Sequence, residues 1–132
     1  MSYLLDTNIV SDLMRNPTGI AAAYLARVGD QTVHTSIVVA AELRYGAARK
    51  KSPRLSQRIE TVLGALDVLP FASPADEIYG EIRAQLEESG EQIGANDLFI
   101  ASQALALGFT LVTDNVREFS RVKSLSIENW LR

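Results

Sequence analysis

The chain contains no cysteine and a single histidine, His34. The first absence excludes disulfide bonds, thiolate catalysis and every zinc site that needs cysteine, and it fits a cytosolic protein. The second excludes metal sites built from several histidines. His34 itself falls within a predicted strand, where a histidine is more often a structural residue than a catalytic base. Metal chemistry is therefore left to oxygen ligands.

Long apolar runs are also missing. No run approaches the roughly 18 residues that cross a bilayer, and the first residues lack the basic-then-apolar pattern of a signal peptide. No P-loop, Gly-x-Gly-x-x-Gly or Gly-x-Ser-x-Gly motif occurs, so the usual phosphate loops and the serine-hydrolase elbow are not indicated. With 132 residues, of which 47% are hydrophobic, we expect one domain covering residues 1–132 and a cytoplasmic location.

The net charge of −3 argues mildly against a general nucleic-acid coat, but the charge is unevenly distributed. All six charged residues between Arg44 and Arg58 are basic, and six of the seven between Asp76 and Glu91 are acidic. A basic run beside a cluster of acids could steer a polyanion toward a metal ion. Two solvated helix faces would give the same pattern, so the charges alone do not decide between these interpretations.

Short apolar runs alternate with segments of helical periodicity along the whole chain. The expected strands cover residues 2–5, 31–35, 68–69, 109–113 and 126–127. The expected helices cover residues 9–14, 17–28, 36–51, 53–66, 73–89, 95–107 and 116–119. Thr7 or Asn8 is expected to cap the first helix, and Thr35 or Ser36 the third. The alternation is typical of a short parallel sheet with helices on both faces, and we predict a three-layer α/β/α sandwich.

Asp6 stands where the first apolar run ends, and a buried charge there is costly unless something pairs with it. Asp114 follows the strand at 109–113 in the same way. Because sites in open parallel sheets form at the carboxyl ends of strands, both carboxylates would emerge on one edge if these strands are neighbours. Turn chemistry is the alternative for both: an Asx turn at Asp6, and an ordinary Asp-Asn turn at Asp114.

Two further acids, Glu42 and Asp97, lie on the predicted packed faces of helices. Glu42 shares its face with Val39, by helical spacing. Asp97 falls in a first turn, where the helix dipole favours an anion. The alternatives are an ion pair of Glu42 with Arg44 or Arg49, and a simple helix cap at Asp97.

Four acids near core segments, with no directly adjacent basic residue, suggest a shared cation. Sites made only of carboxylates suit hard cations, so we expect Mg²⁺, with Mn²⁺ as the alternative. Such an ion activates water and stabilises charge on a phosphoryl group during transfer. Thr7, Asn8 and Ser36 are candidates to orient Asp6 or a water molecule, although each could instead serve as a helix cap.

Several short motifs follow one another in order over nearly the whole chain. They are Leu4–Ile9, Thr35-Ser36 leading to Ala41–Gly46, Ile82–Ala84, Ile93–Asp97 with Ile100-Ala101, Leu111–Thr113 leading to Arg117–Val122, and Glu128–Trp130. In this order the chain resembles the PIN-domain ribonucleases, specifically the VapC toxins of type II toxin–antitoxin systems. The resemblance implies a PIN-like fold and cleavage of single-stranded RNA by metal-activated water.

The resemblance also implies roles for individual acids. Asp6, Glu42 and Asp97 take the family's three acidic positions, with Asp6 and Asp97 as the magnesium ligands. For a fourth catalytic acid we favour Asp114, with its role left open, while Glu118 competes for the same position.

Further residues follow from the same resemblance. Asn115 could orient a water molecule. Arg44, Tyr45, Arg49 and Lys50 would lie near a substrate groove or a partner interface. The implied partners are an RNA substrate, a second copy of the chain, and a VapB-type antitoxin in a higher assembly.

Two other functions are compatible with parts of this pattern. A phosphatase of the haloacid dehalogenase type also places an aspartate after its first strand, but it usually needs a second acid two residues later, where this chain has Asn8. A non-catalytic module with the same fold is the other alternative, and the presence of all three core acids argues against it.

Overall fold

The structure is a computed structural model that describes all 132 residues. Its strands are β1 (Tyr3–Leu5), β2 (Val33–Ser36), β3 (Asp67–Leu69), β4 (Thr110–Val112) and β5 (Ile127–Glu128). Its α-helices are α1 (Thr7–Arg15), α2 (Ile20–Val28), α3 (Ile37–Lys50), α4 (Pro53–Ala65), α5 (Ala75–Glu88), α6 (Ala95–Leu107) and α7 (Val116–Phe119). No helix has the length and apolar character that a membrane span would require.

The strands form one sheet in the order β3-β2-β1-β4-β5, and every neighbouring pair is parallel. From β1 the chain moves outward to β2 and β3, and then returns to place β4 on the opposite side of β1. Leu5 pairs with Thr35 on one side and with Val112 on the other, so β1 and β4 end at the same level and β2 runs one residue further. The reversal beside β1 is a topological switch point, where open α/β sheets bind their ligands.

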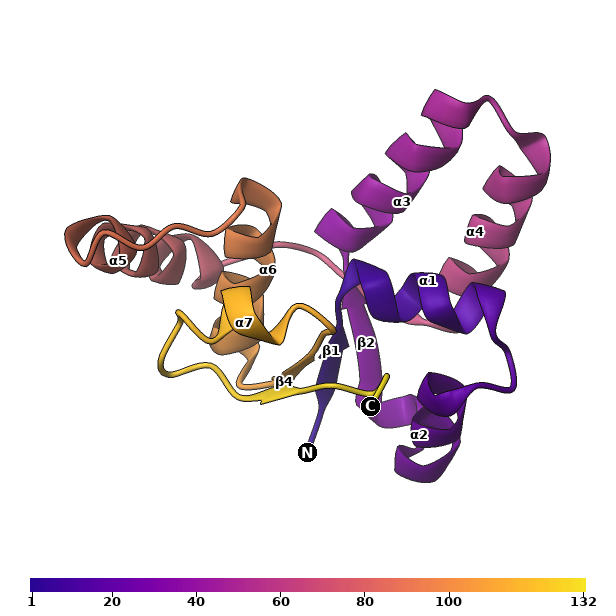
Figure 1. Cartoon of the computed structure of the whole chain (residues 1–132), viewed down its shortest axis with the longest axis horizontal. Helices are drawn as coiled ribbons and strands as arrows, with labels where there is room; N and C mark the ends of the chain where they lie inside the picture. Colours follow the sequence, from indigo (N-terminus) through magenta and orange to yellow (C-terminus); the bar gives the residue numbers. More distant parts are fainter.

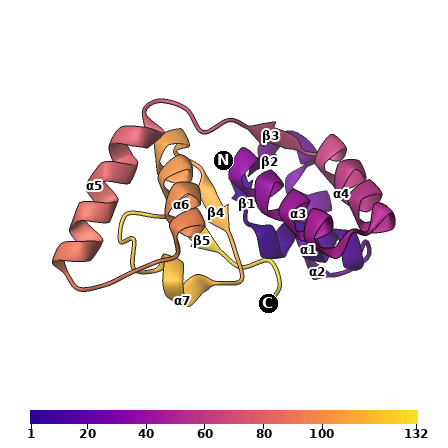
Figure 2. The same cartoon turned by 90° about the horizontal axis from the view of Figure 1, so that it is seen from above.

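Helices cover both faces of this sheet. Figures 1 and 2 show α1 to α4 gathered on one side of the central strands, and α5 and α6 on the other. The central strands between them are fully buried at Leu4, Leu5, Leu111 and Val112. Continuous apolar strands with two covered faces are what the short runs of the sequence predicted, and the three-layer α/β/α sandwich is confirmed.

The C-terminal residues pack into the same core. Trp130 is fully buried, although only Leu131 and Arg132 follow it in the sequence and its segment has no regular structure. Its ring stacks nearly parallel on Tyr24 of α2, with centroids 5.5 Å apart, and tilts against Tyr3 of β1 at 5.3 Å. The guanidinium of Arg27 lies 4.5 Å from the Tyr24 ring centroid. The end of the chain is therefore anchored beside the first strand.

Three local predictions need correction or choice. Asp6, rather than Thr7 or Asn8, is the N-cap of α1, because its carboxylate accepts the N–H of Thr7 and both of those residues already lie inside the helix. Of the two candidates for α3, Ser36 is the cap and accepts the N–H of Val38 at 3.0 Å. The helix expected from residue 17 starts at Ile20, after a turn over residues 16–19.

Candidate active site

Asp6 lies at the switch point, directly after β1, with only 4% of the residue exposed. Its Oδ1 accepts the N–H of Thr7 at 2.8 Å, and its Oδ2 accepts the hydroxyl of Thr113 at 2.7 Å. Burial raises the pKa of Asp6 above its ordinary value, and the two hydrogen bonds only partly oppose this. The negative charges of Glu42 and Glu118 raise the pKa of Asp6 further.

Glu42 projects from α3 toward the start of α1. Its Oε1 accepts the hydroxyl of Thr7 at 2.8 Å, so the residue after Asp6 connects the two acids. Neither of its two expected alternative partners, Arg44 and Arg49, forms an ion pair with Glu42. Arg44 instead forms a two-point ion pair with Glu60 of α4 at 2.8 and 2.9 Å. Glu42 is thus free of cationic partners and half-buried.

Asp97 is the third residue of α6, whose N-cap is Gly94, so it does not serve as the helix cap. It is half-buried and hydrogen bonded to Glu118. Burial, followed by repulsion from Asp6, Glu118 and Glu42, raises the pKa of Asp97 to about 7. A carboxyl group with three carboxylate neighbours and no basic partner would gain from a cation.

Glu118, on α7, is held by three donors. Its Oε1 accepts the N–H of Gly94 at 2.5 Å, its Oε2 accepts the amide of Asn115 at 2.7 Å, and Asp97 shares a hydrogen bond with it. Burial works to raise the pKa of Glu118, but these hydrogen bonds, together with the positive charge of Arg121, outweigh it and lower the pKa below the ordinary value. A methyl group on Gly94 would lie 3.6 Å from Glu118 Oε1 and 3.7 Å from Asp97 Oδ2, so both acids lie against this glycine.

The structure separates the two candidates for the fourth acid. Asp114 does lie at the end of β4, as predicted, but its Oδ1 accepts the amide of Asn129 at 3.1 Å and lies 3.7 Å from Nε of Arg132. Asp114 is not among the charges that act on Asp6 or Asp97, whereas Glu118 acts on both. The geometry therefore favours Glu118 over Asp114, because the turn after β4 directs the Asp114 side chain toward the C-terminus.

The predicted supporting residues take different places. Thr7 binds Glu42, and Asn115 binds Glu118, as groups that orient the acids would. Asn8 is exposed on α1. Ser36 is fully buried, and its hydroxyl is bound to Gln103 of α6, so it connects two helices instead of reaching the acids.

Thr113 is a site residue that the sequence did not single out. Its hydroxyl donates to Asp6 and accepts the N–H of Asn115 at 3.0 Å. Thr113 follows Val112 just as Asp6 follows Leu5, and Leu5 and Val112 are paired in the sheet. The register of β1 and β4 brings the side chains of Asp6 and Thr113 together, and this register cannot be read from one sequence.

The basic run lies on exposed parts of α3 and α4. Tyr45 is 66% exposed, and Arg44, Arg49 and Lys50 are exposed as well. One pocket of about 280 Å³ connects this region with Glu42, and its lining includes Leu55, Arg58 and Lys50. His34, in contrast, pairs with Asp67 at 2.8 Å and stacks on Phe109, which agrees with a structural histidine.

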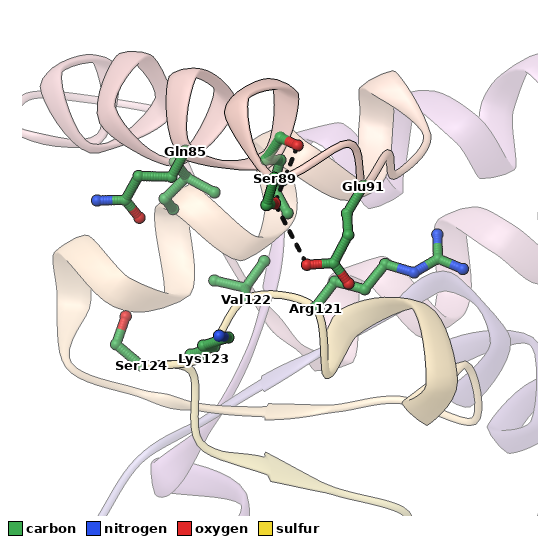
Figure 3. Close-up of a pocket in the computed structure, with 9 residues that line it drawn as sticks. Gln85, Ser89, Glu91, Arg121, Val122, Lys123 and Ser124 are labelled. Carbon is green, nitrogen blue, oxygen red and sulfur yellow. Dashed lines mark hydrogen bonds between the residues drawn. The ribbon is translucent and has the colours of Figure 1, made fainter.

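A second pocket, of about 420 Å³, lies between the end of α5 and the segment after α7 (Figure 3). Its lining includes Gln85, Ser89, Arg121 and Lys123, and the hydroxyl of Ser89 lies 3.4 Å from Glu91 Oε1. None of the four clustered acids lines it. The chemistry of the acids is therefore not connected with this pocket.

The four acids fit a hard cation by their chemistry. All four supply only carboxylate oxygens: Asp6 at the end of β1, Glu42 on α3, Asp97 on α6 and Glu118 on α7. No three of them are already gathered as closely as a complete coordination sphere would require. One or two carboxylates with retained water is the arrangement that Mg²⁺ commonly takes in proteins.

The raised pKa of Asp97 gives a testable pH dependence of stability. Between pH 3.8 and about 7 the folded chain keeps a proton that the unfolded chain has released. The stability gained from this proton is complete below the lower value and is lost as the pH rises through about 7. In EDTA, wild type should lose about 1–2 kcal/mol of unfolding free energy relative to Asp97→Asn between pH 5 and pH 8, allowing for solvent screening. Urea unfolding at both pH values measures this, and parallel pH curves for the two proteins would contradict it.

Comparison with known proteins agrees with this geometry. The family model for the PIN domain matches residues 3–125. Ribonuclease VapC2 of Rickettsia felis is 39% identical over 132 residues, with 98% of each chain covered. The tRNA(fMet)-specific endonuclease VapC of Shigella flexneri is 34% identical over 132 residues, again with 98% of each chain covered. A crystal structure of VapBC2 from Rickettsia felis bound to a DNA fragment from their promoter matches with a TM-score of 0.91 and 36% identity, over 98% of this chain and 99% of that chain.

The chain therefore belongs to the PIN-domain family. Its similarity over nearly the full length to VapC proteins places it in that family's VapC branch, as the ordered motifs predicted. PIN-domain ribonucleases generally depend on a divalent metal ion.

Proposed function

We propose that the chain is an Mg²⁺-dependent endoribonuclease and the toxin of a VapBC-type toxin–antitoxin pair. The observation that carries this proposal is the cluster of four acids at the switch point of a PIN fold, none of which forms an ion pair with a basic side chain. Carboxylate oxygens favour Mg²⁺, with Mn²⁺ as a substitute. The relatives that match over the full length are named as ribonucleases, which supports RNA as the substrate.

Asp6 and Asp97 would hold the ion, because one is fixed at the end of β1 and the other lies against the same carboxylates in the first turn of α6. The ion, when bound, supplies a water of lowered pKa and neutralises charge on the phosphoryl group. Thr7 donates to Glu42 Oε1, and Oε2 of Glu42 has no hydrogen-bond partner, so Oε2 would be the oxygen placed to accept a proton from a water molecule in the site. Asn115 and the N–H of Gly94 keep Glu118 ionised and aligned toward Asp97.

The exposed side chains around the pocket at Glu42 would contact RNA or the antitoxin. The part of α3 beyond Glu42 carries the exposed side chains of Tyr45, Arg49 and Lys50. Arg44 is exposed there as well, with its guanidinium bound to Glu60. A basic surface of this kind binds phosphates through released counterions, so RNA affinity should fall steeply with salt. Because the chain as a whole has a small negative net charge, this attraction for RNA is confined to the basic surface.

The VapBC2 complex of Rickettsia felis contains an antitoxin and a promoter DNA fragment. By similarity we propose a VapB-type antitoxin as the partner of this chain, together with a homodimer and a higher toxin–antitoxin assembly. Residues 1–132 would act as one PIN domain. Because its proposed substrate is cellular RNA, we place the activity in the cytoplasm.

The proposal is tested by incubating the purified chain with single-stranded RNA under three conditions: Mg²⁺, Mn²⁺, and excess EDTA. We expect cleavage within the RNA in the two metals and less than about 1% of that rate in EDTA, because no side chain replaces the ion's charge. Cleavage that continues in EDTA would contradict the metal-dependent mechanism. Hydrolysis of p-nitrophenyl phosphate without RNA cleavage would favour the phosphatase alternative, which lacks its second acid because Asn8 stands in that place.

A further inference from the structure

We propose that Asp114 is a positioning residue through which the C-terminal tail, residues 128–132, holds the acids of the site in place. The inference rests on the proposed metal-dependent function and adds a role for a segment outside the acid cluster. The connection runs through the site loop, defined as Thr113–Asn115, between β4 and α7.

Each residue of the site loop has a different partner. The hydroxyl of Thr113 donates to Asp6 Oδ2 at 2.7 Å, and the amide of Asn115 donates to Glu118 Oε2 at 2.7 Å. Asp114, between them, accepts the amide of Asn129 at 3.1 Å. The loop is thus bound to two acids by its ends and to the C-terminal tail by its middle.

The tail itself is well fixed. Glu128 accepts the backbone N–H of Thr113 at 2.9 Å, and its side chain accepts the indole N–H of Trp130 at 3.1 Å. The Trp130 ring is fully buried between Tyr3 and Tyr24. A tail anchored by a buried aromatic ring can resist movement of the loop to which it is bound.

The orientation of Asn129 is also set within the tail. Its Oδ1 accepts the N–H of Leu131 at 2.9 Å, which leaves Nδ2 to face Asp114. Arg132, the other group near Asp114, is 80% exposed at 3.7 Å and contributes little. The contact therefore needs an acceptor oxygen at position 114 and does not need a negative charge.

This last point separates a positioning residue from a metal ligand or catalytic acid. Asparagine keeps an acceptor oxygen but removes the charge, whereas alanine removes both. If Asp114 acts through Asn129, Asp114→Asn should behave like wild type, and Asp114→Ala should behave like Asn129→Ala. If Asp114 acts by its charge on the metal or the substrate, both substitutions of Asp114 should fail and Asn129→Ala should not.

The experiment compares wild type, Asp114→Asn, Asp114→Ala and Asn129→Ala, with Asp76→Ala on exposed α5 as the control. Thermal unfolding at increasing MnCl2 gives the apparent Mn²⁺ dissociation constant of each protein, and unfolding in EDTA checks that each is folded. The side chains of Asp114 and Asn129 are partly exposed, so the variants should still fold. We expect the constant to rise about 10-fold for Asp114→Ala and Asn129→Ala, and less than about 2-fold for Asp114→Asn and the control.

RNA cleavage provides the second measurement. The loss in Asp114→Ala and Asn129→Ala should recover as MnCl2 is raised, since the acids remain present and only their positions are relaxed. Equal loss in Asp114→Asn and Asp114→Ala, or wild-type Mn²⁺ binding in both Asp114→Ala and Asn129→Ala, would overturn the proposal. If the Mn²⁺ dissociation constants of wild type and the variants follow the expected order but wild type cuts no RNA, the proposed function fails while the positioning role stands.

Discussion

Replacing Asp97 with asparagine is expected to lower RNA cleavage by about 10³-fold or more while the chain stays folded. The substitution removes one of the two proposed metal ligands, and with it the positive charge that the ion would bring to the reacting phosphate, a kind of electrostatic contribution that is commonly among the largest in catalysis. Asparagine has nearly the same shape and can still donate to Glu118, so the change is mainly one of charge. Rates on single-stranded RNA at saturating Mg²⁺ measure the effect.

The matched control for this experiment is Asp76→Asn, because Asp76 is also an acid in the first turn of a helix but lies exposed on α5. It should cleave RNA at the wild-type rate. In a host without antitoxin, expression of wild type and Asp76→Asn should arrest growth, and expression of Asp97→Asn should not. Equal arrest by Asp97→Asn would disprove the role of this carboxylate.

The second large effect is expected on stability, from Trp130→Ala. Loss of a fully buried indole leaves a cavity between Tyr3 and Tyr24 and frees the tail, and such substitutions cost about 3–5 kcal/mol. This is a large share of the roughly 5–15 kcal/mol that stabilises a typical domain. Urea unfolding in EDTA measures the loss, and it should be followed by circular dichroism because Trp130 is the chain's only tryptophan.

Ile20→Ala is the control for that measurement. Ile20 is a large apolar residue that is 55% exposed at the start of α2, so its truncation should change the unfolding free energy by less than about 1 kcal/mol. If Trp130→Ala costs no more than this control, the tail does not belong to the core.

Local chemistry explains why the fold was largely predictable. The apolar run before Asp6 and the helical periodicity of the segments that form α5 and α6 act over a few residues, and each appears in the structure near its predicted place. The start of α2 was wrong by three residues, since the turn at residues 16–19 precedes it. The cap of α1 was wrong because a carboxylate at the end of a strand can also serve as a helix cap.

The site was less predictable, because it depends on where elements meet. Asp6 could be singled out as an acid at the end of a buried strand, and Glu42 and Asp97 as acids on packed helix faces. The common surroundings of the three acids agree with that interpretation. The choice between Asp114 and Glu118 depended on the direction of one turn, which no local pattern specifies. Thr113 was missed because its importance follows from strand register, and Gln103 because its partners lie 34 and 67 residues away.

The shortness of the outer strands has a consequence for a chain produced in excess of any partner. The sheet ends in β3, with three residues, and β5, with two, and β3 begins with the charged and exposed Asp67. Unpaired backbone groups on long, flat outer strands invite pairing with other molecules, and short or charged ones discourage it. Newly made copies of the chain therefore have little tendency to join sheet to sheet through these outer strands.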